Sequence, residues 1–544
     1  MKARGTNQLL IEDGSSWRFV NGVWNDGEGG GLAPAEDVLF SDGESMQGHH
    51  YAFCTAVSIG DARISFDFRL NPHSDAGIIL HAKDEGHFYL LHFPNCGQAF
   101  RAQHFWVALS KMDSSGYLKL VKLDMVRRVP SNSGIWLSAK ITLTGSKISV
   151  DIGDHGHFEA DDEGLAGSGC IGVYSYRRAD IRNVLVDGEE RPSSWNKDQK
   201  QPTNWFQPCP DTVHGVSQLP LDLLRLPSGE LLLNYHVDKD GPFAGEKTPL
   251  LTRSNDNGRT WSEPGLLRVV QEEGRWLSAR LWLTPANRLL AVVLSQTGYI
   301  TAESKDEGRT WSEPTQVEIE IPPKMKGLHI GPQSFSNLAD GSMLWLLYSG
   351  YALDDPDLTV TNWGAVHCRA FCLRSTDDGR TWSLPANMDN SAGMGQIAQS
   401  GSLDLTEVCA AQMADGRIMA LIRPAYSPWM WETWSEDGGT SWGPCVRGEF
   451  PGYATPNMLR TAGGRTIVAH RLPSLAVHCS GDDGHTWDQG TVIDGSLWVM
   501  GSMIEVEPEL VLYIYSTGLL MRGQFIRTTD AGLEPVRIGQ THED

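Results

Sequence analysis

A glutamate and an arginine stand at the two ends of one short segment, "LTEVCAAQMADGRIMALIRP" (405–424). Two apolar runs flank a turn signal, which predicts a β-hairpin with Glu407 just before its first strand and Arg423 at the end of its second. Both side chains would then lie at the same end of the hairpin. A carboxylate there can accept a proton, and a guanidinium can hold another carboxylate through paired hydrogen bonds. The alternative is a plain Glu–Arg ion pair, because a carboxylate that enters a buried strand needs a partner.

We expect further side chains that can bind a substrate or take part in catalysis at the end of the fold where Glu407 and Arg423 lie, which we call the rim. A lone histidine is more often a structural residue than a catalyst, but several candidates at one rim favour a site. His329 and His236 are the next candidate bases after Glu407. The further candidates for substrate binding at this rim are Arg280, Arg471 and Tyr426, with Trp429 as a stacking platform.

The hairpin of Glu407 is one of six similar units, each with two apolar strands and a tight turn. Each of the first five precedes a repeated phrase, Ser-x-Asp-x-Gly-x-Thr-Trp in its full form, and the sixth precedes "TTDAGLEP" at Thr528, which lacks the tryptophan. A third strand, this corner and a fourth strand would complete each unit. Repeated four-stranded blades close into a β-propeller, which protects the edges of its sheets. The six hairpins are "LLRLPSGELLLNY", "LWLTPANRLLAVV", "SFSNLADGSMLWLLY", "AAQMADGRIMALI", "NMLRTAGGRTIVAH" and "MIEVEPELVLYIY".

The repeated phrase has a structural explanation. Its Ser and Asp side chains can accept backbone N–H bonds, its glycine permits an unusual backbone shape, and its tryptophan can bury a large ring. The phrase lacks the ligand series of a calcium-binding loop. The corners begin at Ser254, Ser304, Ser375, Ser435 and Ser480.

Composition excludes several classes of partner. The chain has 544 residues and a net charge of −22, which argues against nucleic acid or an anionic membrane as the main partner. Its nine cysteines have no metal-ligand spacing, and the closest pair, Cys368 and Cys372, is predicted to be two buried thiols. We therefore expect no metal and no cofactor. No apolar run is long enough for a transmembrane helix, and no secretory signal opens the chain. We expect the protein to be cytoplasmic as written, or secreted or periplasmic if a signal was removed; the oligomeric state is left open.

The first part of the chain predicts a separate all-β domain. "ARISFDFRL" alternates apolar and polar residues, and "AKITLTGSKISVDI" predicts a hairpin. The segment ending in "GCIGVYSYRRADIRNVLV" resembles the closing strands of concanavalin-like (laminin-G-like) sandwiches. We predict a β-sandwich over 1–188, a polar linker over 189–204 and a six-bladed propeller over 205–544. Carbohydrate binding by the sandwich and a purely structural role are both open.

The repeated phrase resembles the Asp-box of the sialidase (neuraminidase) superfamily, and the resemblance covers about Trp205 to the C-terminus. It implies a six-bladed propeller whose Asp-boxes lie on the face away from the active site. It also implies that Glu407 and Arg423 match the family's glutamate and second arginine, and that Arg471 matches its third arginine.

Two positions depart from the pattern of that family. Gln218, in "SQLP", stands where the family has its first arginine, and Trp498, in "GSLWVMGSM", stands near the place of its nucleophilic tyrosine. Glu246 is nearest in spacing to the family's acid. These departures argue against sialic acid as the natural substrate or against the usual tyrosine chemistry.

Three functions remain open on the sequence alone. The first is an exo-acting glycoside hydrolase on a sialic-acid-like or uronic-acid glycan, which the resemblance and the Glu407–Arg423 pair favour. The second is a polysaccharide lyase on uronate glycans, in which arginines neutralise the carboxylate and a base removes a proton. The third is a non-catalytic glycan-binding protein. One fold can host all three.

Overall fold

The computed structural model describes most of the chain. The residues described are 7–8, 17–20, 24–27, 31–34, 49–70, 74–95, 106–125, 135–176, 179–209, 217–238, 247–295, 298–320, 330–351, 367–388, 405–424, 429–452, 456–496, 500–518 and 520–538. The chain divides into two compact units. The first comprises Met1–Thr203, Arg471–Val477 and Gln489–Trp498, and the second comprises Asn204–His470, His478–Asp488 and Val499–Asp544.

The first unit is built from antiparallel strands around one apolar core. The long strand β5 (His49–Arg69) pairs with β2, β10, β13 and β14, and β6 and β7 continue from β13. Alternate residues of β5 and β10, such as Ile64 and Ile141, fill the core, as the alternating sequence predicts. A β-sandwich remains our prediction for this unit. The remaining strands are β1 (Asn7–Gln8), β2 (Trp17–Val20), β3 (Trp24–Gly27), β4 (Gly31–Pro34), β6 (Asp75–Asp84), β7 (His87–Pro94), β8 (Trp106–Met112), β9 (Leu118–Met125), β10 (Leu137–Thr144), β11 (Lys147–Asp151), β12 (His157–Asp161), β13 (Gly169–Tyr176) and β14 (Asp180–Pro192).

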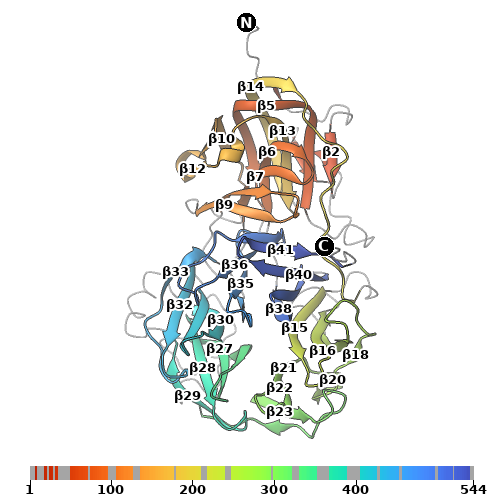
Figure 1. Cartoon of the computed structure of the whole chain (residues 1–544), viewed down its shortest axis with the longest axis vertical. Helices are drawn as coiled ribbons and strands as arrows, with labels where there is room; N and C mark the ends of the chain where they lie inside the picture. The colour runs from red at the N-terminus through yellow and green to blue at the C-terminus, as the bar shows by residue number, and fades with distance from the viewer. Residues whose placement is uncertain are drawn as a thin grey trace. The chain divides into compact units, whose positions relative to one another are not determined.

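The second unit is a β-propeller, and its blades appear as neighbouring groups of strands in Figure 1. The first blade has β15 (Ser217–Arg225), β16 (Leu231–Asp238), β17 (Lys247–Ser254) and β18 (Gly265–Leu266). The second has β21 (Ala279–Leu283), β22 (Leu289–Ser295), β23 (Gly298–Ser304) and β24 (Thr315–Gln316). The third has β26 (Ile330–Asn337), β27 (Met343–Tyr351), β28 (His367–Ser375) and β29 (Trp382–Asn387), with β25 (Ile319–Glu320) added in parallel to β29. The fourth has β30 (Leu405–Gln412), β31 (Ile418–Pro424), β32 (Trp429–Ser435) and β33 (Val446–Pro451), and the last has β38 (Met500–Glu507), β39 (Leu510–Ser516), β40 (Met521–Thr529) and β41 (Gly532–Val536).

The prediction of six separate blades is wrong: five blades are detected among the described residues. The fifth hairpin forms strands β34 (Asn457–Arg460), β35 (Thr466–Arg471), β36 (Leu475–Ser480) and β37 (Thr491–Asp494). The last of these, β37, pairs with β9, with Thr491 opposite Lys119. Strand β37 therefore belongs to the first unit, and this hairpin does not stand as a separate four-stranded blade. Two short strands, β19 (Gln271–Glu272) and β20 (Arg275–Trp276), form a small separate hairpin.

The repeated corners are closed by a fixed set of hydrogen bonds. In the first, Ser254 Oγ accepts from the Gly258 N–H at 2.8 Å, and Asp256 Oδ1 accepts from the Thr260 N–H at 2.9 Å. The Thr260 hydroxyl donates to Asp256 Oδ2 at 2.6 Å, and Trp261 Nε1 donates to the Gly258 carbonyl at 3.0 Å. Gly258 has φ of +88°, which glycine adopts without strain. The serine and aspartate bonds recur in the corners that begin at Ser304, Ser375, Ser435 and Ser480.

The corners and the Glu407–Arg423 pair lie at opposite ends of the blade strands. Ser254, which opens the first corner, is paired with Leu231, the first residue after the tight turn of its hairpin. The corners therefore lie at the same end of the blades as the tight turns. Glu407 and Arg423 lie at the other end, near the start of β30 and the end of β31. We call this other end the open rim.

Candidate functional site

The Glu407–Arg423 pair is formed in the structure, and an irregularity of the strand positions it. Leu405 is opposite Pro424 and Val408 is opposite Ile422, so that Thr406 and Glu407 together face Arg423. Such a bulge redirects side chains at the end of a ladder. The Arg423 Nη1 donates to Glu407 Oε2 at 2.7 Å, while the Thr406 hydroxyl donates to the Arg423 carbonyl at 3.0 Å.

Both side chains of the pair are largely buried, but each keeps a small solvent-exposed fraction. The Arg423 side chain is 7% exposed and the Glu407 side chain is 14% exposed. Truncating either side chain, so that the other charge is left buried without any hydrogen-bond partner, costs about 3–5 kcal/mol. The contact can therefore stabilise the blade, and the residual exposure leaves it within reach of a ligand. Thr406 was not among the sequence candidates; the irregular register that brings it to Arg423 has no signal in the sequence.

Gln218 has a structural contact where the resemblance placed an arginine. Its side chain is buried, and its amide oxygen accepts from the Met521 N–H at 3.0 Å. This bond links β15 of the first blade to β40 of the last. A part for Gln218 in substrate binding stays a prediction.

Arg280 links the first and second blades. Its Nε donates to Asp222 Oδ1 at 2.8 Å, and the same carboxylate accepts from the Leu281 N–H and from the Asn234 amide. A buried carboxylate with this set of donors is well satisfied. Asp222 was not among the candidates from the sequence, although its place as an acidic residue inside the apolar run "LPLDLLRL" could have indicated a buried carboxylate with polar partners. Substrate binding by Arg280 stays a prediction.

His236 is buried beside Asp238 near the end of β16. Its Nε2 is 3.7 Å from Asp238 Oδ2, too long for a hydrogen bond. Burial, with a smaller contribution from Lys247, lowers the pKa of His236 from its ordinary value to about 3. The imidazole is therefore neutral at physiological pH and is a weak base.

We expect His236 to make the protein sensitive to acid. Because the folded-state pKa lies below the unfolded value of about 6.5, the unfolded chain binds the extra proton between these values, and stability falls as pH drops through that window. Replacing His236 with leucine should flatten the slope of unfolding free energy by up to about 1.4 kcal/mol per pH unit between about pH 6 and 4. Denaturant unfolding at a series of pH values measures this. The exposed His157 provides the control, and a His236→Leu slope equal to that of His157→Leu would contradict the expectation.

Among the remaining sequence candidates, Arg471 belongs to a different unit from the Glu407–Arg423 pair. Arg471 is buried at the end of β35 and clusters with the first unit, whereas Glu407 and Arg423 belong to the second. Its membership of one site with them stays a prediction. Four candidates lie outside the described residues: Glu246, His329, Tyr426 and Trp498.

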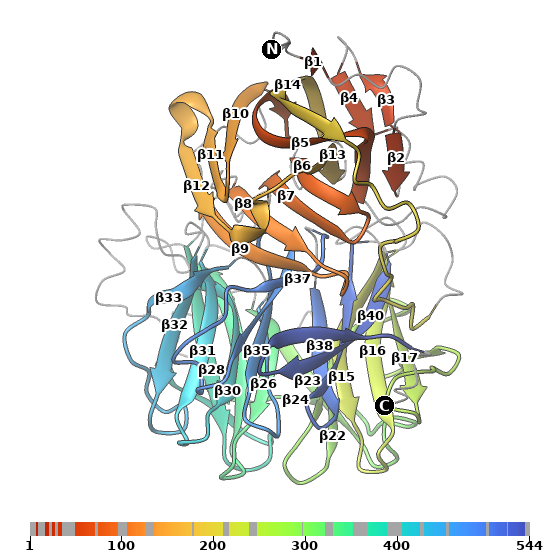
Figure 2. The ribbon, with the colours of Figure 1, turned by 45° about the horizontal axis from the view of Figure 1, so that its top comes forward.

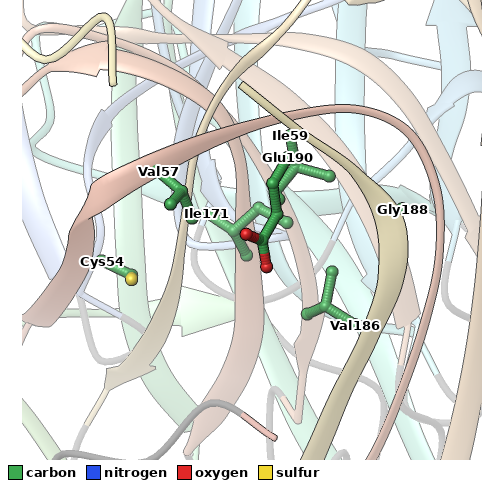
Figure 3. A pocket seen from close by; sticks show the side chains of 7 residues that line it. All are labelled: Cys54, Val57, Ile59, Ile171, Val186, Gly188 and Glu190. Atoms are coloured by element: carbon green, nitrogen blue, oxygen red, sulfur yellow. The ribbon is translucent and has the colours of Figure 1, made fainter. Parts of the chain in front are cut away.

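Two hollows among the described residues lie away from the open rim. A groove of about 410 Å³ lies at the corner end of the first two blades, and its Arg288 is paired with Glu303 and Asp378. A cavity of about 40 Å³ lies in the first unit, where Figure 3 shows the Glu190 carboxylate near Ile171 and Val186. Ligand pockets usually measure roughly 300–1,000 Å³, so the second cavity is too small for a sugar. Within the described residues there is no cluster of three or more His, Cys, Asp or Glu side chains that could hold a metal ion.

A family model described as a BNR repeat-like domain matches residues 275–498. No curated protein matches the chain. In the described part of the chain, no helix has the length and hydropathy needed to cross a membrane.

Similar solved structures share little sequence with the chain. A protein of unknown function from Dyadobacter fermentans has 15% identity and a TM-score of 0.45, over 60% of this chain and 100% of that one. The Hadza microbial sialidase Hz136 has 13% identity and a TM-score of 0.44, over 86% and 93% of the two chains. The α-L-arabinofuranosidase Arb93A from Fusarium graminearum has 14% identity and a TM-score of 0.42, over 60% and 97%. What the sequence and structure together establish is a BNR repeat-like segment within an all-β chain that contains a β-propeller.

Proposed function

We propose that the chain is a carbohydrate-active enzyme, an exo-acting glycoside hydrolase for a glycan whose terminal sugar carries a carboxylate. The observation that carries this proposal is the Arg423–Glu407 pair at the open rim, with its 2.7 Å bond and its small residual exposure. A guanidinium is the preferred partner of a carboxylate because it offers two parallel N–H donors. The sialic-acid-like and uronic-acid sugars are the two substrate classes that fit.

The pair divides the chemistry between its two members. Arg423 would bind and orient the carboxylate of the sugar, which holds the scissile bond in place. Glu407 would take a proton from the group that attacks the anomeric carbon of the terminal sugar. An acid would protonate the leaving oxygen as the glycosidic C–O bond breaks. We assign the acid to Glu246 on spacing alone. Water supplies the hydroxyl that remains on the released sugar.

A non-catalytic glycan-binding protein is the second candidate, and Gln218 favours it. Where the sialidase resemblance implies a substrate-binding arginine, this chain has Gln218, whose amide oxygen already accepts a hydrogen bond from the Met521 N–H. The lyase alternative is disfavoured for His236, because a side chain with a pKa of about 3 is a poor base for removing a proton from carbon.

Digestion of defined oligosaccharides by the full chain tests the proposal. The panel contains glycans ending in sialic acid, in glucuronic acid and in a neutral sugar, and two signals are followed: new reducing ends, and ultraviolet absorbance of an unsaturated uronate. New ends without absorbance from a carboxylate-bearing glycan support a hydrolase. Rising absorbance identifies a lyase, and binding without either signal identifies the second candidate.

Replacing Arg423 with lysine should weaken substrate binding with little change in the chemical step. Lysine keeps the charge but cannot make the paired contact, and a hydrogen bond to a charged group contributes about 1.5–3 kcal/mol. We expect KM, or Kd for a pure binder, to rise by roughly 10- to 100-fold. Steady-state kinetics or calorimetry measures this, and Arg253→Lys, which alters the similar pair with Glu230 at the corner end, is the control. Equal effects of the two replacements would contradict the role of Arg423.

A further inference from the structure

An extra residue near the start of β30 changes the face on which the following side chains lie. In a regular strand successive side chains alternate between the two faces, so residues three positions apart lie on opposite faces. Leu405 and Val408 are three positions apart, yet both are buried in the one core that joins the third and fourth blades. The strand can place both there because Thr406 and Glu407 together lie opposite the single residue Arg423.

This bulge determines where the carboxylate of Glu407 lies. Glu407 is partly exposed, whereas Thr406 before it and Val408 after it are buried. Its Oε2 accepts from Arg423 Nη1 at 2.7 Å, across the two strands that Figure 2 shows next to one another as β30 and β31. The carboxylate therefore meets the guanidinium at the open rim only while the bulge keeps its shape.

A side-chain hydrogen bond closes the bulge. The Thr406 hydroxyl donates to the Arg423 carbonyl at 3.0 Å, and Thr406 is 1% exposed. A bulge interrupts the backbone ladder of its two strands, and a threonine hydroxyl can bond to the backbone in its place. Breaking this bond is unfavourable, because a buried hydroxyl without a partner is costly.

Threonine also holds its hydroxyl in a fixed direction. Its branched Cβ restricts the first side-chain torsion, so that few orientations of the hydroxyl are available. Two consecutive residues of β30 are thus bonded to one residue of β31: Glu407 to the side chain of Arg423, and Thr406 to its backbone. The second bond fixes the chain directly before Glu407, and so limits how far its carboxylate can move.

We infer that Thr406 is a positioning residue for Glu407, an inference that rests on the proposed function. Thr406 is buried, so it acts through Glu407 and not by touching the sugar. Its hydroxyl fixes the bulge, and the bulge holds the carboxylate where it can take a proton from the attacking group. Without the hydroxyl, Arg423 still binds the carboxylate of the sugar, but Glu407 loses its position. A displacement of about 1 Å can lower a rate by about 100-fold.

Steady-state kinetics of Thr406→Val in the full chain tests this inference. The probes are a sialic-acid-terminated trisaccharide and a glucuronic-acid-terminated disaccharide, and new reducing ends are followed. Valine keeps the branched shape and removes the hydroxyl. We expect kcat and kcat/KM to fall together by about tenfold or more with KM nearly unchanged, because the lost interaction acts in the transition state. Thr406→Ser, which keeps a hydroxyl, should recover most of the turnover.

Two comparisons separate positioning from stability. Thr433→Val is the matched control, since the buried Thr433 hydroxyl donates to the Gly443 carbonyl at 2.8 Å in the same blade, but at the corner end. It should leave kcat per folded molecule unchanged. In the Glu407→Gln background, Thr406→Val should lower kcat little further, because two changes that act through one group are not additive.

The outcomes distinguish this inference from the proposed function. If the wild type cleaves a probe and Glu407→Gln is impaired, but folded Thr406→Val has normal kcat, the inference is overturned and the proposed function stands. The same conclusion follows if Thr406→Val is as damaging in the Glu407→Gln background as in the wild type. If the wild type cleaves neither probe, both are overturned.

A second pair of variants decides the case in which Thr406→Val does not fold. Thr406→Ala removes the hydroxyl with less change in packing on the strand, and Thr406→Ser keeps it. A lowered kcat in the alanine variant alone supports the positioning role. Equal kcat in the two variants overturns it.

Discussion

Replacing Glu407 with glutamine is expected to lower turnover by about 100-fold or more, the usual effect of losing a group that transfers a proton. The amide has the same shape as the carboxylate and can still accept the bond from Arg423, but it cannot take a proton. The melting temperature should therefore change by only a few degrees, roughly the shift that 1 kcal/mol produces. Turnover and thermal melting, measured on the same preparation, test the expectation.

Glu230→Gln is the matched control for this change. Glu230 forms a comparable pair with Arg253 at 2.5 Å, but at the corner end of the first blade. It should show the same small change in melting and full turnover. If Glu407→Gln lowers the melting temperature strongly while turnover per folded molecule is normal, the pair with Arg423 is only structural.

Replacing Trp382 with alanine is expected to cost about 3–5 kcal/mol of folding free energy, as removal of a buried aromatic ring does. Trp382 is 5% exposed, and its ring lies 5.4 Å from that of Trp282 and 5.5 Å from that of Trp345. It belongs to the core between the second and third blades. Because it lies at the corner end, turnover of the folded fraction should be nearly normal.

Trp261→Ala and Trp311→Ala are the comparison for Trp382→Ala. Both tryptophans occupy the same corner position but are only partly buried at the edge of their cores. They should cost less than Trp382→Ala when unfolding is followed by denaturant titration. Equal costs at the three positions would show that the hydrogen bonds of the corner, and not burial of the ring, determine the effect.

The local elements were predictable from the sequence because their signals are local. The serine, aspartate, glycine and tryptophan of the corner predicted a closed turn, and the first corner shows the bonds from Ser254, Asp256 and Trp261 that close it. The pairing of Glu407 with Arg423 was also predictable, since the hairpin fixes both ends. The sequence patterns of these segments act over a few residues, so neighbouring structure does not override them.

The features that the sequence did not predict depend on contacts between distant segments. Nothing in "GTVIDG" indicates that β37 pairs with β9, and this pairing leaves the fifth hairpin without a separate blade of its own. The bond from Met521 to Gln218 likewise joins opposite ends of the propeller sequence.

The central claim, that the open rim recognises a carboxylate through Arg423, is tested most directly by one comparison. Binding of an acidic oligosaccharide to the full chain is measured by calorimetry against binding of the same oligosaccharide with its carboxylate reduced to an alcohol. We predict that reduction weakens binding to the wild type by about tenfold or more, and that Arg423→Lys narrows this difference. Equal affinity of the wild type for the two oligosaccharides, or a difference that Arg423→Lys leaves unchanged, would contradict the claim.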